Sequence, residues 1–185
     1  MRDLIVTENI TLDGVIEAAE WFNVANAEGV DQSDLNAVLS AHMASSDAVL
    51  FGRISFEQMR GYWPNQTNDT SGVTDHLNKA TKYVVSSTLD DPEWANTVIL
   101  RGIDEIRAVQ DRPGKDIVAT GSIQLVHALI AADLVDEYRL FVYPVVQGAG
   151  KRLFADGLEI PALRLVETRP FKSGVVLLRY RKSSR

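Results

Sequence analysis

The sequence predicts an α/β protein, in which helices cover both faces of a mostly parallel β-sheet that ends in an antiparallel hairpin. Over the first two thirds of the chain, short apolar runs typical of buried strands alternate with segments of helical periodicity. The remaining third holds long strand-like runs with no room for helices between them. We find no internal repeat or linker, so we expect a single domain over residues 1–185.

The alternating part begins with a strand over Leu4–Thr11, which stops at a turn formed by Asp13 and Gly14. Residues 15–32 have no clear period, and we expect a long, partly aromatic loop there, able to close as a lid over a bound substrate. Ser33 is a candidate N-cap of the following helix. Further strands are predicted over 48–51, 83–85, 97–100 and 117–119, and helices over 34–45, 55–60, 73–80, 103–110 and 122–132.

The C-terminal part is predicted to be antiparallel β-structure. Residues 136–146, 163–171 and 175–181 each have the pattern of a long strand. The three residues 172–174, Lys-Ser-Gly, separate the last two strands and predict a hairpin turn. Because long apolar edge strands need covering, we expect these strands to form the interface of a homodimer.

The composition narrows the possible functions. The chain is 45% hydrophobic and 24% charged, as soluble globular proteins are, and its net charge of -6 argues against a general nucleic-acid-binding surface. It has no cysteine, which excludes disulfides, thiol catalysis and cysteine-bound metals, and its three histidines have no metal-site spacing. No apolar run approaches the ~20 residues of a membrane-spanning helix, and we identify no signal peptide. We therefore expect a cytoplasmic protein without metal, membrane or nucleic-acid partners.

Three short turns rich in glycine and hydroxyl side chains each follow a predicted strand. They lie within AVLFGRIS (48–55), KYVVSSTL (82–89) and DIVATGSIQL (116–125). The first and third are followed by helical patterns, and a helix N-terminus offers phosphate free N–H groups and partial positive charge. Glycine also lets a phosphate approach the backbone. Three such turns predict an extended, multiply phosphorylated ligand, and a dinucleotide fits that description.

Five segments of the chain, in this order, resemble the dihydrofolate reductase-like superfamily. The closer resemblance is to its branch related to the reductase domain of the bifunctional riboflavin-biosynthesis deaminase/reductase. The segments are TLDGVIE, VLFGRISFE, YVVSSTL, VATGSIQLVHALIAADLVDEYRL and YPVVQGAGKRLF. This resemblance implies the three-layer dihydrofolate reductase-like fold. It also implies an NADPH-dependent reductase that transfers hydride to a small pterin- or aminopyrimidine-like heterocycle.

The resemblance also assigns roles to residues of four turns. The hydroxyls of Ser86 and Ser87 would lie near the adenosine 2′-phosphate, which favours NADPH over NADH, since an acidic residue there would favour NAD. Asp13, Asp34 and a bound water are the candidate catalytic proton donors, and a carboxyl group in this role needs a pKa raised by burial. The implied cofactor-binding residues are Leu12, Gly14, Gly52, Arg53, Ser55, Ser86, Ser87, Gly121, Ser122 and Ile123.

Two features depart from the related enzymes. The chain lacks the zinc-binding deaminase motif, so it could supply only the reductase half. No basic cluster is committed to a ribose phosphate, although Lys151 and Arg152 are candidates. Two other interpretations stay open: an NADP(H)-binding protein without turnover, and a structural dimeric module whose glycine turns serve only the fold.

Overall fold

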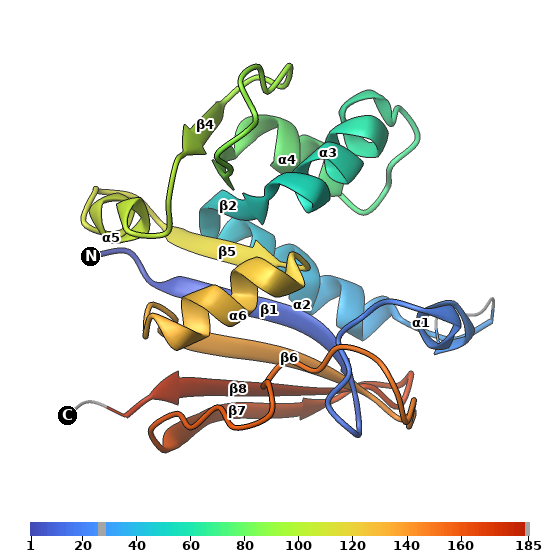
Figure 1. The fold of residues 1–185 in the computed structure, drawn as a ribbon. Helices are drawn as coiled ribbons and strands as arrows, with labels where there is room; N and C mark the ends of the chain where they lie inside the picture. Colours follow the sequence, from blue (N-terminus) through green and yellow to red (C-terminus); the bar gives the residue numbers. More distant parts are fainter. Residues whose placement is uncertain (26–28, 184–185) are drawn as a thin grey trace.

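In the computed structural model, which describes residues 1–25 and 29–183, one sheet crosses the whole molecule (Figure 1). Within the described residues its strand order is β4-β3-β2-β5-β1-β6-β8-β7. The five strands from β4 to β1, together with β6, run parallel, whereas β8 is antiparallel to both β6 and β7. The strands are β1 (Leu4–Thr11), β2 (Ser46–Gly52), β3 (Thr81–Val85), β4 (Thr97–Leu100), β5 (Asp116–Thr120), β6 (Glu137–Tyr143), β7 (Leu163–Pro170) and β8 (Val176–Lys182).

Helices cover both faces of this sheet, which confirms the predicted three-layer architecture. The apolar sides of α5 and α6 pack on one face, where Val126 and Leu129 are fully buried against strand residues such as Leu4 and Val6. On the other face, α2 packs over β6 and β8, and α3 and α4 pack over β2 and β3. The helices are α1 (Glu20–Ala25), α2 (Ser33–Ala44), α3 (Arg53–Tyr62), α4 (Val73–Lys79), α5 (Glu105–Gln110) and α6 (Ile123–Ala131), with a 3₁₀ turn η1 (Trp63–Asn65).

The segment 15–32 differs from the predicted loop, because it contains the short helix α1. Trp21 is buried, donates its indole N–H to the Glu17 carbonyl at 3.1 Å, and meets the Tyr143 ring edge-on at a centroid distance of 5.5 Å. A helix of six residues is too short to show a period in the sequence. The expected lid is therefore anchored at α1, and its residues 26–28 lie outside the described part of the chain.

The start of α2 also differs by one residue from the prediction. The helix begins at Ser33, with Gln32 in the N-cap position, so Ser33 is not the cap. Asp31 takes the capping role from further upstream, because its carboxylate accepts the Ser33 backbone N–H at 3.0 Å and the Ser33 hydroxyl at 2.7 Å. The prediction failed because Asp and Ser both cap helices, and Asp31 and Ser33 lie on either side of the residue in the N-cap position.

The topology places the predicted turns at one edge of the sheet. Strand β5 lies between β1 and β2 although it follows both in sequence. Because β1, β2, β3 and β5 are parallel, the turns that follow them all leave from the same, carboxyl edge. Ligands of open parallel sheets bind outside this edge, where the strand order reverses. No helix in the described residues is long and apolar enough to cross a membrane.

Candidate functional site

Two of the three predicted turns are joined by a pair of hydrogen bonds. The Gly52 N–H donates to the Ser122 hydroxyl at 3.0 Å, and the Ser122 N–H donates to the Ser55 hydroxyl at 3.1 Å. The contact requires an unusual backbone, since Gly121 and Ser122 have φ values of +60° and +49°. Residues 70 positions apart in the chain thus form one surface at the ends of β2 and β5.

The N-terminus of α6 opens onto this surface. The first hydrogen bond inside the helix runs from the Val126 N–H to the Ser122 carbonyl at 3.0 Å. The N–H groups of Ile123, Gln124 and Leu125 precede it and have no helical carbonyl to bind. A β-carbon at Gly52 would meet Ser122 at an ordinary 3.7 Å, so the packing of the protein does not require glycine there. The arrangement fits a phosphate group.

The third turn, at Ser86 and Ser87, follows β3 and is flanked by arginines. The Ser86 hydroxyl accepts the Leu89 N–H at 2.9 Å and is buried, whereas Ser87 is exposed. Arg101, directly after β4, donates to the carbonyls of Ser86 at 3.2 Å and Leu89 at 2.8 Å. We did not predict Arg101 from the sequence, although its place after a predicted strand was the same signal that singled out the other turns.

Arg53, directly after β2, lies on the other side of this turn. Its guanidinium pairs with Glu57, one helical turn further along α3, at 2.9 Å. Both side chains are exposed, and exposed pairs of this kind contribute little stability, so the guanidinium is free to exchange this partner for a phosphate. Arg53, Ser87 and Arg101 thus follow three neighbouring parallel strands.

The turn after β1 is fastened to the loop that follows β6. The Asp13 carboxylate accepts hydrogen bonds from the Thr11 hydroxyl at 2.6 Å, the Gln147 N–H at 3.1 Å and the Gly148 N–H at 2.7 Å. These bonds, that of Thr11 first, lower the pKa of Asp13 to about 2. A carboxylate held ionised in this way is a poor proton donor, so the geometry opposes the catalytic role predicted for Asp13.

The neighbours of Asp13 are arranged for contact with a ligand. The Leu12 side chain is 64% exposed, although its backbone N–H is fixed to the Val145 carbonyl at 2.8 Å. Gly14 has a φ of +86°, which lets the chain reverse its direction sharply before Val15. An exposed leucine on a fastened turn offers an apolar wall for a flat ring.

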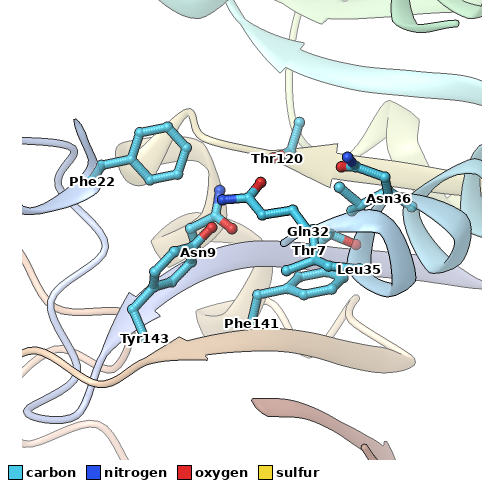
Figure 2. A pocket seen from close by; sticks show the side chains of 10 residues that line it. Thr7, Asn9, Phe22, Gln32, Leu35, Asn36, Thr120, Phe141 and Tyr143 are labelled. Carbon is cyan, nitrogen blue, oxygen red and sulfur yellow. The ribbon is translucent and has the colours of Figure 1, made fainter. Parts of the chain in front are cut away.

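A pocket of about 300 Å³ lies on the α2 face of the sheet (Figure 2). Figure 2 shows side chains from β1, β6, α1 and α2 around a shared space, with Asn9 and the Gln32 amide close together. Thr120 also lines the pocket and immediately precedes Gly121, so the pocket adjoins the surface formed by the joined turns after β2 and β5. The lining residues are Thr7, Asn9, Phe22, Gln32, Leu35, Asn36, Leu39, Thr120, Phe141 and Tyr143.

Asp34, the second predicted proton donor, does not line this pocket. Its carboxylate accepts the Lys172 backbone N–H at 3.1 Å and so ties α2 to the turn between β7 and β8. Asn36, two residues further along the helix, lines the pocket in its place. Both residues lie on α2, but a shift of two positions along a helix turns a side chain to another face, so Asp34 and Asn36 face different surroundings.

Glu8, on β1, is a buried carboxyl group that we did not predict. It is only 5% exposed, and its Oε1 has no hydrogen-bond partner within the described residues. Burial raises the pKa of Glu8 well above its usual range, against the opposing effect of the Gly121 N–H. The sequence held a signal, because Glu8 interrupts the apolar alternation of Leu4, Val6 and Ile10 on one strand face.

Comparison with known proteins places this architecture in a family. Uncharacterized protein YyaP of Bacillus subtilis (strain 168) is 36% identical over 186 residues, covering 97% of this chain and 94% of that protein. Dihydrofolate reductase from Enterococcus faecalis, complexed with NADP(H), shares the fold with a TM-score of 0.63 at 17% identity, over 98% of this chain and 97% of the other.

A bifunctional enzyme shares the fold as well. The diaminohydroxyphosphoribosylaminopyrimidine deaminase/5-amino-6-(5-phosphoribosylamino)uracil reductase of Thermotoga maritima has a TM-score of 0.66 at 14% identity. The match covers 98% of this chain and 57% of that one. The family model described as RibD C-terminal domain matches residues 2–177. The chain therefore belongs to the RibD C-terminal domain family.

Proposed function

We propose that this protein is an NADPH-dependent reductase of a small heterocyclic substrate. The observation that carries the proposal is the meeting of four strand-end turns at one sheet edge, directly beside a pocket lined by aromatic and neutral polar side chains. Family membership supports a reductase-type function, and the similarity to a dihydrofolate reductase complexed with NADP(H) supports the cofactor.

The residues at the edge suit the parts of this dinucleotide. The free N–H groups at the start of α6 and the joined turns of Gly52 and Ser122 would hold the pyrophosphate. Arg53 and Arg101, on either side of Ser87, would hold the adenosine 2′-phosphate by charge-assisted hydrogen bonds. Because NADH lacks this phosphate, the two arginines would make the protein selective for NADPH.

The pocket residues would then position the substrate. When bound, the cofactor supplies a hydride. The rings of Phe22 and Tyr143 can stack against a flat substrate and exclude water, and Leu12 can confine the adjoining ring of the cofactor. Neither Asp13 nor Asp34 lines the pocket, so we propose that the required proton comes from a water molecule held by Asn9 or Asn36.

Calorimetric titration with NADPH and NADH tests the cofactor assignment. We expect micromolar binding of NADPH and at least tenfold weaker binding of NADH. Arg101→Ala is expected to weaken NADPH much more than NADH, because the 2′-phosphate is lost as a partner only for NADPH, whereas the lost hydrogen bonds to the Ser86 and Leu89 carbonyls affect both cofactors alike. Arg112→Ala, on the segment between α5 and β5, is the matched control and is expected to change neither affinity. Absence of NADPH binding to the wild-type protein would overturn the proposal.

NADPH oxidation, followed at 340 nm with pterin and aminopyrimidine substrates, separates an enzyme from an NADP(H)-binding protein without turnover.

We also propose a homodimer formed through β7, an edge strand on which Leu165 and Val166 are 48% and 39% exposed. Light scattering is expected to give twice the mass of the chain, and Leu165→Lys is expected to reduce it. A monomeric wild-type protein would contradict the dimer.

A further inference from the structure

The lining of the pocket contains no charged side chain among the described residues. Its polar members are three side-chain amides, from Asn9, Gln32 and Asn36, and three hydroxyls, from Thr7, Thr120 and Tyr143. The other lining residues are apolar or aromatic. A phosphate or carboxylate buried in such a pocket would lose its hydration without gaining a counter-ion, which is strongly unfavourable. A buried basic group would meet the same difficulty.

The sequence extends this observation to the surroundings of the pocket. Residues 3–52 contain no lysine and no arginine, but nine aspartates and glutamates. This stretch supplies β1, α1 and α2, and it includes residues 23–28, beside Phe22, whose side chains lie outside the described part. The pocket walls from this stretch therefore have no cation of their own with which to bind an anionic substituent.

Two cations close in the fold to lining residues, Lys172 and Arg139, are each already paired with a carboxylate. Lys172 is paired with Asp31 at 2.8 Å, and its backbone N–H binds Asp34, so this cluster next to α2 carries two carboxylates for one ammonium group. Arg139, on β6, is 4% exposed and does not line the pocket. Its Nε donates to Glu137 at 2.7 Å, although its Nη1 has no partner within the described residues.

We infer that the substrate is an uncharged planar heterocycle with a lactam or amide edge, and that it carries neither a phosphate nor a carboxylate. The inference rests on the proposed reductase function and narrows its substrate. A side-chain amide offers one acceptor and two donors, so Asn9 and Asn36 complement the alternating C=O and N–H groups of a lactam ring. The aromatic side chains cover its faces. The substrate named for the Thermotoga maritima enzyme carries a phosphoribosyl group and is therefore anionic, unlike the substrate that we infer.

Two matched pairs of probes test this inference without any need for turnover. Pterin and pterin-6-carboxylate share one ring system and differ by one anionic group, as do uridine and uridine 5′-phosphate. Each is titrated into the protein saturated with NADP⁺ and, separately, into the protein alone. We expect the neutral member of at least one pair to bind ten or more times tighter than its anionic partner. Equal or tighter binding of the anionic members, or no binding of any probe, would overturn the inference.

A variant that introduces a charge into the pocket provides the second test of the inference. Asn36→Lys places an ammonium group in the pocket wall and is expected to reverse the preference within the pair that binds. Asn68→Lys, in the exposed loop between η1 and α4, makes the same chemical change away from the pocket and is expected to leave the preference unchanged. An unchanged preference in Asn36→Lys would count against the pocket as the binding site. Failure of NADPH to bind, with pterin still bound, would overturn the reductase but not the substrate class.

Discussion

Replacing Ser122 tests whether the joined turns hold the carboxyl edge together. Its hydroxyl accepts the Gly52 N–H at 3.0 Å, and its own N–H donates to Ser55 at 3.1 Å. Ser122→Ala leaves the part-buried Gly52 N–H without its acceptor but keeps a side chain on a backbone with φ of +49°. Ser122→Gly loses the same hydrogen bond and relieves the left-handed backbone, so the two variants separate the two effects.

The magnitudes follow from these two contributions to the free energy of unfolding. An N–H that loses its partner in a part-buried site costs about 1–3 kcal/mol, and we expect Ser122→Ala to destabilise the protein by about 2 kcal/mol. Left-handed backbone costs an ordinary residue about 1–2 kcal/mol, and glycine recovers this energy but loses about 0.5–1 kcal/mol to the entropy of the unfolded chain. Ser122→Gly is therefore expected to be more stable than Ser122→Ala by about 0.5–1 kcal/mol.

Urea denaturation of the wild type and the variants measures these differences. Ser87→Ala is the matched stability control, because Ser87 is exposed, and surface changes of this kind stay within about 0.5 kcal/mol of the wild type. We also expect Ser122→Ala to weaken NADPH binding, since Gly52 and the first turn of α6 lose their common anchor. A Ser122→Ala variant as stable as Ser87→Ala would refute the reasoning.

Three further predictions concern titratable groups. Burial lowers the pKa of the fully buried Lys82 from 10.5 to about 8, so the unfolded chain holds more protons than the folded protein between these pH values. The free energy of unfolding should therefore rise by about 3 kcal/mol from pH 8 to pH 10.5. Urea titrations of Lys82→Met should show no such rise. Burial raises the pKa of Glu8, so its contribution to stability is complete below about pH 4.3 and is lost as pH rises through the folded-state pKa. The stability advantage of Glu8→Gln, measured by thermal unfolding, should therefore grow with pH, and a constant difference would contradict this. Asp13, with a pKa of about 2, contributes fully to folding stability above about pH 3.9, and this contribution is lost as the pH falls through 2. Asp13→Asn should speed amide hydrogen exchange at Gly148 at neutral pH, and an unchanged rate would contradict a stabilising role for the hydrogen bond between Asp13 and Gly148.

The fold was largely predictable because its signals are local. Each apolar run bounded by glycine, serine or threonine became a strand, and the change from alternating helices to consecutive strands after α6 marked the antiparallel part. The predictions for α1 and for the start of α2 were wrong, because the sequence signals that determine these two elements are weak. Trp21 fixes α1 through contacts with Tyr143, more than 100 residues away. Such contacts do not leave a periodic pattern.

The candidate site was predictable only in part, for a related reason. The turns of Gly52 and Gly121 were found because glycine, hydroxyl and helix-start residues stand together in the sequence. Asp34 was a candidate because the resemblance implies a carboxylate on this helix, but only the packed helix shows that Asn36, and not Asp34, lines the pocket. Glu8 stood out less, since one acidic residue in a strand is often exposed. Its burial depends on Gly121 and α6, which approach from far along the chain.

The two halves of the site are therefore built by different means, and this difference bears on function. The proposed cofactor half depends on backbone N–H groups and positive φ angles at strand ends, together with the side chains of Arg53 and Arg101. The proposed substrate half consists of side chains, most of them on β1, α1, α2 and β6, and its polar members Asn9, Gln32 and Asn36 lie outside the hydrophobic core. Members of one family can thus keep the cofactor and exchange the substrate. In this chain, a stretch of 50 residues without lysine or arginine, residues 3–52, supplies most of that second half. On our inference, the charge of the pocket wall therefore narrows the substrate further than membership of the family does.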